Sequence, residues 1–377
     1  MKVVVAIDSF KGSLSSLDAG TAVSLAVKEV DNSAEVKVVS LADGGEGTVD
    51  ALVLGTGGIY KEVVVTAPLG DKVTARYGII NGDTCVVEVS SACGITLVKK
   101  EELNPLNATT FGVGEIILDA LSNGCRKFIV GLGGSATNDC GVGMLQALGF
   151  SFLDASGKEV CLGAKGVGDI AKIVTDKADI RLKSCVFEIA CDVKNSLVGE
   201  FGCSEIFSRQ KGATDEQVRV MDGYLNRFAD LYKEVNPLSD KNAEGVGAAG
   251  GLGFAFKYFL NGNMGSGIDL VIGKIGLEDM VKTADIIVTG EGKLDGQSAM
   301  GKAPIGVAKL AKKYGKKVVA FCGAIGDGAE SLNELGIDAF FSIVNSPCSL
   351  EKAMQKEVAF ENLKNTAKQV FRLWQNI

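Results

Sequence analysis

The sequence of 377 residues contains no histidine, only one tryptophan and only five prolines. The absence of histidine excludes a Ser-His-Asp triad, a histidine-ligated zinc site and a histidine general base. Any acid–base chemistry must therefore use the side chains of Asp, Glu, Lys or Tyr.

Long apolar runs and dense basic patches are also missing. No stretch approaches the roughly 18 uninterrupted apolar residues of a membrane-spanning helix. The formal net charge of −7 argues against a nucleic-acid partner. We therefore expect neither a membrane nor a nucleic acid among the partners of this chain.

The ten cysteines show no CxxC pair and no metal-like spacing, so we expect most of them to be small buried residues. The N-terminus runs straight into an apolar segment, Val3–Ile7, without a small-residue cleavage site. Both features predict a reducing, cytoplasmic location.

Glycine, in contrast, is abundant: it makes up 49 of the 377 residues and gathers in four polar loops. Gly131–Gly143 follows a strand-like run, Lys127–Val130, and leads into a helix-like segment. At such a junction backbone N–H groups can bind anions, and the helix dipole favours negative charge. The other three loops have a similar composition: Ala42–Thr48, Gly245–Gly253 and Thr289–Lys302. Together the four loops predict a nucleotide and a second small ligand.

Strand and helix patterns alternate regularly at both ends of the chain. The apolar periodicity predicts strands at residues 3–7, 36–41, 285–288, 318–322 and 339–344. Helices are expected between them, including a short one over 328–335, and a last helix over about 350–374. The middle of the chain instead shows antiparallel strand patterns, at 62–65, 72–80 and 84–89, with a hairpin turn at Asn81–Asp83.

These patterns predict an α/β fold with two domains. The alternating ends form a flavodoxin-like five-strand parallel-sheet domain, 1–59 plus 281–377, which is interrupted by a second mixed α/β domain, 60–280. Ligands of such sheets bind beyond the carboxyl ends of the strands, where the polar motifs of this chain fall. We therefore expect the active site in the cleft between the two domains.

Two familiar nucleotide motifs match by letter but not in context. Gly131–Ala136 reads G-x-G-x-x-A, but the acid expected to bind a ribose, Asp154, opens a DASGK turn instead of ending a parallel strand. Gly296–Lys302 reads GxxxxGK, but Ala303 replaces the Ser or Thr that binds Mg²⁺. The strand before this segment is also expected to end too early for a P-loop. Lys302 can still contact phosphate.

Charged side chains at the predicted strand ends form the candidate site. Lys11, beside Asp8 and Ser9, follows the first strand, where its charge would neutralise phosphate oxygens. Glu291 and Asp295 flank glycines in the last loop. They are the predicted metal ligands, because Mg²⁺ binds through one or two carboxylates plus phosphate oxygens.

Asp192 follows a predicted strand at Val186–Ala190 and is the candidate to accept the proton of a hydroxyl group. Arg209, Gln210 and Lys211 precede a predicted helix and would bind a small carboxylate. For each of these residues the alternative is a structural role, as a capping acid or a solvated surface charge. The remaining predicted binding residues lie on the glycine loops: Asp43, Gly44, Gly45, Glu46, Gly133, Gly134, Ser135, Asn138, Asp139, Gly250 and Gly251.

Several long motifs follow one another along the whole chain: DSFKGSLS from Asp8, ADGGEGT from Ala42, APLG from Ala67, NPLNATTFGVGE from Asn104, GLGGSATNDCGVGMLQALG from Gly131, ACDVKN from Ala190, QKGA from Gln210, GAAGGLGFA from Gly247 and TGEGKLDGQSAMGKAPIGVA from Thr289. In these motifs and their order the chain resembles the bacterial glycerate kinases of type I.

The resemblance implies Mg²⁺- and ATP-dependent phosphorylation of D-glycerate, commonly at the 2-hydroxyl to give 2-phosphoglycerate, with the 3-hydroxyl as the alternative. It also implies a flavodoxin-like domain interrupted by a second α/β domain. The chain departs from the family pattern at Ser208-Arg209, where FGPQKGA is expected, and at Ser196, where a proline is expected. The first departure lies in the segment predicted to bind a carboxylate, so it bears on substrate preference.

Three other functions stay open at the level of the sequence. A dinucleotide-dependent oxidoreductase would require that the strand holding Leu153 is not part of an antiparallel pair. A non-catalytic nucleotide-binding module would function unchanged after Asp192→Asn or Lys11→Ala. A kinase of the galactokinase and homoserine kinase superfamily has a related glycine-serine loop, but this chain lacks the leading proline and second serine of that loop.

Overall fold

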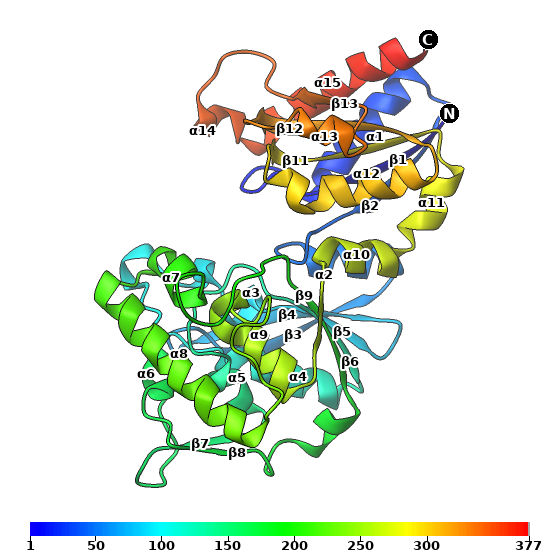
Figure 1. Cartoon of the computed structure of the whole chain (residues 1–377). Coiled ribbons are helices and arrows are strands. Elements are labelled where there is room, and N and C mark those ends of the chain that lie inside the picture. Colours follow the sequence, from blue (N-terminus) through cyan, green and yellow to red (C-terminus); the bar gives the residue numbers. More distant parts are fainter. Residues whose placement is uncertain (376–377) are drawn as a thin grey trace. The chain divides into compact units, whose positions relative to one another are not determined.

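The computed structural model describes residues 1–375, with the backbone alone for Met300, and these residues form two compact units. The first unit comprises residues 1–43, 50–56 and 268–377 within that range, and the second comprises 44–49 and 57–267 (Figure 1). Each unit has its own sheet and its own hydrophobic core. The two are described separately below.

The first unit is built on a five-stranded sheet in which every strand is parallel to its neighbours. The order β13-β12-β11-β1-β2 puts two strands from the end of the chain on one side of β11 and the two N-terminal strands on the other. In such an order the crossover direction reverses between β1 and β11, and ligands bind beyond the carboxyl ends at that point. The strands are β1 (Lys2–Ile7), β2 (Glu35–Ser40), β11 (Ile286–Leu294), β12 (Lys317–Ile325) and β13 (Ala339–Ser342).

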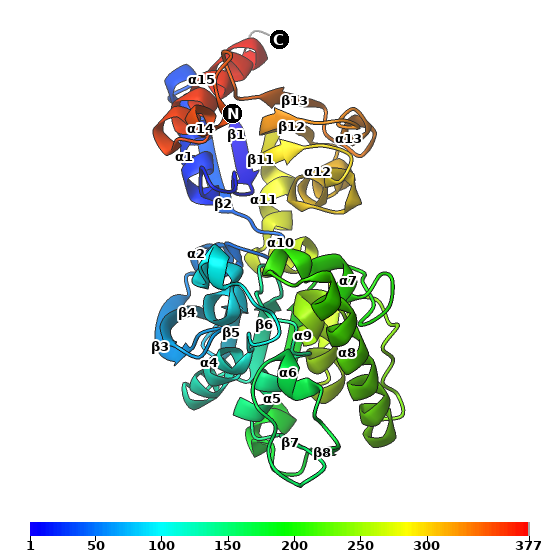
Figure 2. The same cartoon turned by 90° about the vertical axis from the view of Figure 1, so that its left-hand side faces the viewer.

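Helices cover both faces of this sheet (Figure 2). One face packs on α1 (Ser16–Val30) and α15 (Lys356–Gln375), whose small and apolar side chains fill the core between them. The buried side of α1 consists of small and β-branched residues, among them Ala19, Val23 and Val27. The Ser15 hydroxyl caps this helix by accepting a hydrogen bond from the Asp18 N–H at 3.1 Å. The other helices of the unit are α10 (Gly267–Ile275), α11 (Leu277–Thr283), α12 (Ala303–Lys313), α13 (Ser331–Glu334) and α14 (Leu350–Ala353), while α2 (Thr48–Thr56) is shared with the second unit.

Two predicted helices of this unit are wrong in extent. The helix expected over 328–335 is only the single turn α13. The helix expected over about 350–374 is interrupted after α14, at Met354–Gln355, before α15 begins. At this break the Met354 side chain contacts the β1–α1 loop, since its Cε methyl would lie 2.9 Å from a Cβ placed on Gly12. Tertiary contact therefore overrides the helical periodicity here.

The second unit contains a mixed six-stranded sheet of order β10-β9-β6-β5-β4-β3. The predicted antiparallel meander β3-β4-β5 is confirmed, with the hairpin turn at residues 81–83. From β5 onward the strands are parallel. The strands are β3 (Ile59–Thr66), β4 (Lys72–Ile80), β5 (Thr84–Glu88), β6 (Lys127–Gly131), β9 (Val186–Ala190) and β10 (Asn263–Gly265).

Aromatic side chains form the centre of the second unit's core. Phe128 and Phe187 stack with ring centroids 4.7 Å apart, and Phe228 contacts Phe254 at 6.2 Å. The long helix α8 (Asp215–Val235) is capped by Thr214, which forms a capping box with Gln217. The other helices of this unit are α3 (Ser90–Cys93), α4 (Phe111–Ser122), α5 (Val142–Ala147), α6 (Ala164–Val167), α7 (Cys203–Phe207) and α9 (Ala248–Phe259).

A small separate sheet decides one of the open alternatives. β7 (Ser151–Leu153) pairs antiparallel with β8 (Lys172–Val174). Asp154 then opens a tight turn, in which its carboxylate accepts hydrogen bonds from the N–H groups of Ser156 (2.8 Å) and Lys158 (3.0 Å). A dinucleotide-binding unit needs a parallel strand at this place, so that interpretation of Gly131–Ala136 is excluded.

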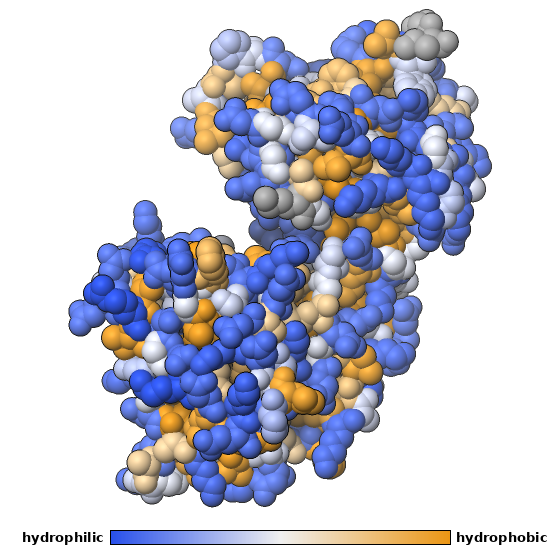
Figure 3. All heavy atoms as spheres, in the orientation of Figure 1, coloured by the Kyte–Doolittle hydropathy of each residue, from blue (hydrophilic) through white to orange (hydrophobic). Residues whose placement is uncertain are grey.

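The structure bears on the cysteines and on the hydrophobicity of the surface. All ten cysteines are free and six of them are buried. In the face drawn in Figure 3, hydrophobic residues lie scattered among hydrophilic ones on both units. Among residues 1–375, no helix has both the length and the hydropathy required to cross a membrane.

Candidate functional site

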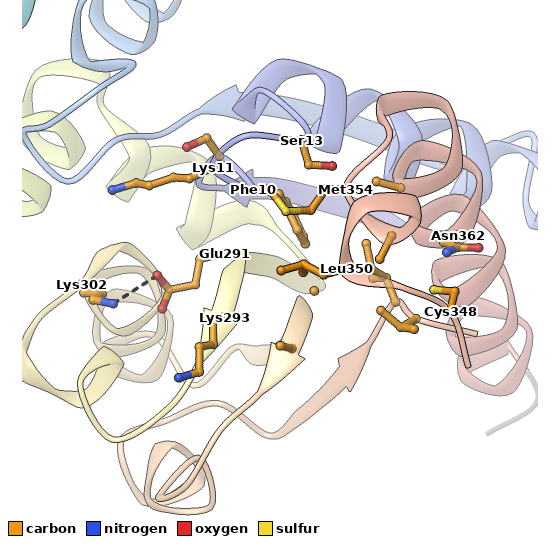
Figure 4. A pocket seen from close by; sticks show the side chains of 18 of the residues that line it. Phe10, Lys11, Ser13, Glu291, Lys293, Lys302, Cys348, Leu350, Met354 and Asn362 are labelled. Atoms are coloured by element: carbon orange, nitrogen blue, oxygen red, sulfur yellow. Dashed lines mark ion pairs between the residues drawn. The ribbon is translucent and has the colours of Figure 1, made fainter. Parts of the chain in front are cut away.

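A cavity of about 640 Å³ lies within the first unit, at the carboxyl ends of its strands (Figure 4). Ser9 and Lys11 follow β1, Asp43 follows β2, and Glu291 lies on β11. Lys302, the residue before α12, also lines the cavity. The structure thus brings together five of the predicted site residues from four separate segments of the chain.

Three carboxylates interact at this edge of the sheet. Burial and, after it, the neighbouring charge of Asp43 raise the pKa of Asp8 to about 7, against the opposing effect of the hydrogen bond from the Ser9 N–H (2.7 Å). Burial also raises the pKa of Glu291, and the charge of Asp43 adds to this effect. Asp8 and Glu291 therefore stand in a region where negative charge is costly, which is the condition under which a cation binds well.

Two lysines partly offset this negative charge. The charge of Lys11 favours the ionised forms of both Asp8 and Glu291. The ammonium group of Lys302 lies 3.8 Å from a carboxylate oxygen of Glu291, the ion pair drawn in Figure 4. Because carboxylates and lysines alternate here, the site can accept a polyphosphate and a divalent cation together.

Asp295, the other predicted metal ligand, is engaged locally. Its carboxylate pairs with Lys293 at 2.9 Å and accepts the Gln297 N–H at 2.9 Å, and the Lys293 ammonium lowers its pKa. It is not among the residues that line the cavity. Its role as a metal ligand stays a prediction.

Ser298 is a site residue that the sequence analysis missed. It is fully buried in the short 3₁₀ turn Ser298–Met300, donates its hydroxyl proton to Glu291 and accepts the Asp295 N–H at 3.2 Å. It therefore fixes the orientation of the Glu291 carboxylate. The spacing of Asp295 and Ser298 could have indicated this role, because a Ser three residues after an Asp is typical of a turn stabilised by side chains.

The strand before Lys302 is longer than predicted. β11 does not end at Val288 but continues to Leu294, because Thr289–Leu294 pairs with β12. The order strand, loop, helix is therefore that of a P-loop, contrary to the expectation from sequence. Ala303 still lacks the hydroxyl that a P-loop uses to bind Mg²⁺.

In the second unit the Gly131–Gly143 loop is held by a buried acid. Asp139 is fully buried and accepts hydrogen bonds from the N–H and hydroxyl of Thr110 (both 2.9 Å) and from the N–H groups of Gly141 (3.2 Å) and Gly143 (3.3 Å). Burial raises the pKa of Asp139 while these hydrogen bonds lower it. Thr110 stands at the N-cap position of α4, and its N–H and hydroxyl join the start of that helix to this loop.

The other polar side chains of this loop also face the interior. The buried Lys211 donates to the Ser135 hydroxyl (3.0 Å) and to the Thr137 carbonyl (2.7 Å), and Asn138 donates to Ser204 (2.9 Å). Burial lowers the pKa of Lys211 to about 8. Gly133 and Gly134, by contrast, are exposed. A ligand of this loop would therefore contact the backbone of Gly133 and Gly134, while the charged group of Lys211 lies buried beneath the loop.

Two further glycine motifs pack against this loop. A Cβ on Gly131 would clash with the Gly44 carbonyl, so the ADGGEGT segment approaches the loop closely at Gly44 and Gly45. At the start of α9, Ala249–Gly251 are left-handed, and a Cβ on Gly250 would clash with the Thr137 carbonyl. These glycines permit close backbone contact, whereas their contact with a ligand stays a prediction.

The remaining predicted residues lie on the surface of the second unit. Asp192 follows β9, is exposed, and accepts the Gly267 N–H at 3.0 Å. Arg209 is exposed and forms ion pairs with Glu205 (2.9 Å) and Asp215 (2.8 Å). Gln210 and Glu46 are also exposed. The structure thus brings Lys211 and Ser135 together, whereas the Arg209 side chain points to the carboxylates of Glu205 and Asp215.

Comparisons with known proteins agree with one another. A family model described as the glycerate kinase family matches residues 3–375. The glycerate kinase of Bacillus subtilis (strain 168) is 43% identical over 371 residues, covering 98% of this chain and 97% of that protein. The glycerate 2-kinase of Escherichia coli (strain K12) is 41% identical over 371 residues, with the same coverage of 98% and 97%.

A solved structure extends the similarity to three dimensions. The crystal structure of a protein from Salmonella typhimurium LT2, described as glycerate kinase 2, superimposes with a TM-score of 0.90. It is 40% identical, and the match covers 100% of this chain and 98% of that one.

The raised pKa of Asp8 predicts a pH-dependent cost to stability. Between about pH 4 and 7 the folded state retains a proton that the unfolded state releases, so the free energy of unfolding falls as pH rises. The difference between pKa values of 3.8 and about 7 corresponds to an upper limit of roughly 4 kcal/mol. Asp8→Asn should therefore stabilise the first unit at pH 8 but not at pH 4.5.

Urea unfolding followed by the fluorescence of Trp374 measures this effect. Trp374 is the sole tryptophan and packs on the core of the first unit, so it reports on that unit alone. Asp295→Asn is the control, because the pKa of Asp295 is lowered and no gain at high pH is expected. If the difference in free energy of unfolding between wild type and Asp8→Asn stayed constant with pH, the raised pKa of Asp8 would be contradicted.

Lys211 and Arg209 should differ sharply in their structural importance. Lys211→Ala removes two buried hydrogen bonds, and each buried group left without a partner costs about 1–3 kcal/mol. Arg209→Ala removes exposed ion pairs worth roughly 0–1 kcal/mol. In hydrogen-exchange mass spectrometry, peptides from residues 131–143 should exchange faster in Lys211→Ala and unchanged in Arg209→Ala. Equal exchange in both variants would show that Lys211 does not hold the loop.

Proposed function

The chain belongs to the glycerate kinase family, and on that premise we propose that it transfers the γ-phosphoryl group of ATP to the 2-hydroxyl of D-glycerate. The products would be 2-phosphoglycerate and ADP. The observation that carries the proposal is the similarity over the whole chain, including to a protein named glycerate 2-kinase. Transfer to the 3-hydroxyl is the second candidate.

The chemistry requires no histidine. Phosphoryl transfer depends mainly on positioning the reactants and neutralising charge. The 2-hydroxyl oxygen of glycerate forms a bond to the γ-phosphorus, while the bond from that phosphorus to the β–γ bridging oxygen breaks and its electron pair leaves with ADP. The proton of the hydroxyl goes to a carboxylate, for which we propose Asp192. Lys11 and Lys302 neutralise the phosphate oxygens.

The first unit also offers ligands that suit Mg²⁺. Glu291 and Asp43 both line the cavity, and their repulsion would be relieved by a divalent cation. We propose this pair in place of Glu291 and Asp295, because Asp43 lines the cavity together with Glu291 and Asp295 does not. Within residues 1–375 no group of three or more His, Cys, Asp or Glu side chains is arranged to hold a metal ion. Glu291 and Asp43 would hold the Mg²⁺ ion, which when bound would neutralise negative charge that develops on the phosphate oxygens.

For glycerate we propose the glycine loop of the second unit. Gly133 and Gly134 expose their backbone, and the buried charge of Lys211 lies at hydrogen-bond distance from the adjoining Ser135. Exposed N–H groups with a cation behind them suit a small carboxylate. Arg209, whose guanidinium already pairs with two carboxylates, is the weaker candidate.

We further propose that the first unit corresponds to the predicted flavodoxin-like domain, 1–59 plus 281–377, interrupted by the second domain, 60–280. Numbered within that domain, its strands have the order 2-1-3-4-5, as in flavodoxin-like sheets. The site residues of the first unit follow β1 and β2 or lie on and beyond β11.

Product analysis by ³¹P NMR tests the function. With D-glycerate and MgATP the expected new resonance is that of 2-phosphoglycerate, and authentic 2- and 3-phosphoglycerate identify it. L-glycerate is the control for the enantiomer. No phosphorylated product from either enantiomer would overturn the proposal, and 3-phosphoglycerate would move the transfer to the other hydroxyl.

Asp192→Asn tests the proposed base. Because general-base catalysis typically contributes about 10²–10⁴-fold, kcat should fall by at least roughly 100-fold. The KM for ATP should change little. Asp154→Asn, which changes an acid whose carboxylate accepts hydrogen bonds from N–H groups of its own turn, is the matched control and should retain wild-type kcat. Near wild-type kcat in Asp192→Asn would remove this residue as the base.

A further inference from the structure

The cavity of the first unit has two ends of opposite character (Figure 4). At one end Lys11, Glu291 and Lys302 present their charged groups. At the other end the lining includes Leu350 and Met354 of the C-terminal segment. Val344 of the same segment is a further apolar residue that lines the cavity. We name these last three residues the apolar wall.

The apolar wall is unusually accessible to solvent. Leu350 is 75% exposed, and Val344 and Met354 are each 38% exposed. Single exposed apolar residues are common on soluble proteins, but several that line one concave cavity mark a ligand site. A volume of about 640 Å³ is ample for an organic ligand.

The wall is fixed to the rest of the unit. Ser349 caps α14 by accepting the Lys352 N–H at 3.3 Å, and Lys356 at the start of α15 pairs with Asp18 of α1 at 2.8 Å. Met354 reaches the β1–α1 loop that carries Lys11. The cavity therefore has a preformed apolar surface continuous with its charged end.

Two hydroxyl groups in the β1–α1 loop indicate that a ligand of this cavity would also have polar atoms. Ser9 and Ser13 both line the cavity. Their Oγ atoms are inaccessible to solvent and have no hydrogen-bond partner in the part of the chain that the structure describes. A buried hydroxyl without a partner is costly, so a ligand atom that reaches it gains affinity.

We infer that the apolar wall holds the base of the nucleotide substrate, with the polyphosphate directed to Lys11 and Lys302. The inference rests on the proposed kinase function and assigns its nucleotide to the first unit. A purine nucleoside triphosphate has a flat, weakly polar base at one end and anionic phosphates at the other. Glycerate is small and polar throughout, so it would leave the apolar wall in contact with water.

Calorimetric titration of the full chain tests this assignment without relying on turnover. The probes are MgAMP-PNP, Mg-tripolyphosphate and D-glycerate. The double variant Leu350→Ala/Met354→Ala should weaken MgAMP-PNP binding by about 10–100-fold, because two apolar contacts are lost. Its affinity for tripolyphosphate should stay within about twofold of wild type. Lys11→Ala should weaken both phosphate-containing probes.

Two further variants complete the test. Ala353→Trp places a bulky ring in the cavity and should abolish MgAMP-PNP binding. Its urea midpoint, followed by far-UV circular dichroism because the new tryptophan adds to the fluorescence, should equal that of wild type and show that the fold is intact. Leu373→Ala removes a leucine that is 64% exposed on α15 but does not line the cavity, so it should bind all probes as wild type.

The outcomes separate this inference from the proposed function. Wild-type MgAMP-PNP affinity in the double variant would overturn the inference, as would a selective loss of glycerate binding. If the wild-type chain made no phosphoglycerate but lost MgAMP-PNP binding on mutation of the wall, the nucleotide site would stand and the glycerate kinase proposal would fail.

Discussion

The mutual repulsion of Asp8, Asp43 and Glu291 is the constraint on which the first unit's site depends. The parallel sheet brings the carboxyl ends of β1, β2 and β11 to one edge, so acids far apart in sequence share a poorly solvated region. Such an arrangement lowers stability unless cations offset it. Lys11 and Lys302 do so in part, and the site is therefore poised for a ligand that carries a cation. Stability is sacrificed here for binding.

Much of the fold could be predicted from periodicity, because β-branched runs and apolar stripes directly reflect burial. The five parallel strands and the antiparallel meander follow in this way. The extension of β11 could not be predicted, since TGEGKL has the composition of a loop and becomes a strand only by pairing with β12. The break before α15 likewise depends on the contact of Met354 with a distant loop.

The lining of the cavity was predictable where a charged residue follows a strand, as for Lys11 after β1 and Asp43 after β2. Sequence could not show which way a polar side chain turns. Asp139 and Asn138 look like ligand-binding residues of a glycine loop, yet both are buried and bind neighbouring segments. Leu350 and Met354 were hidden for the opposite reason, because apolar residues at helical spacing normally belong to a core. Only the tertiary structure shows that they face a cavity.

The position of β1 between β2 and β11 has a consequence for how the chain is made. Val5 pairs with Val38, close in sequence, but its other neighbour is Val288. During synthesis β1 has one unpaired, apolar edge until β11 leaves the ribosome, and the second unit can fold in the meantime. Exposed edges of this kind invite wrong pairing. The N-terminal β1-α1-β2 unit, whose two strands are parallel, therefore keeps one exposed strand edge until the C-terminal strands have been made.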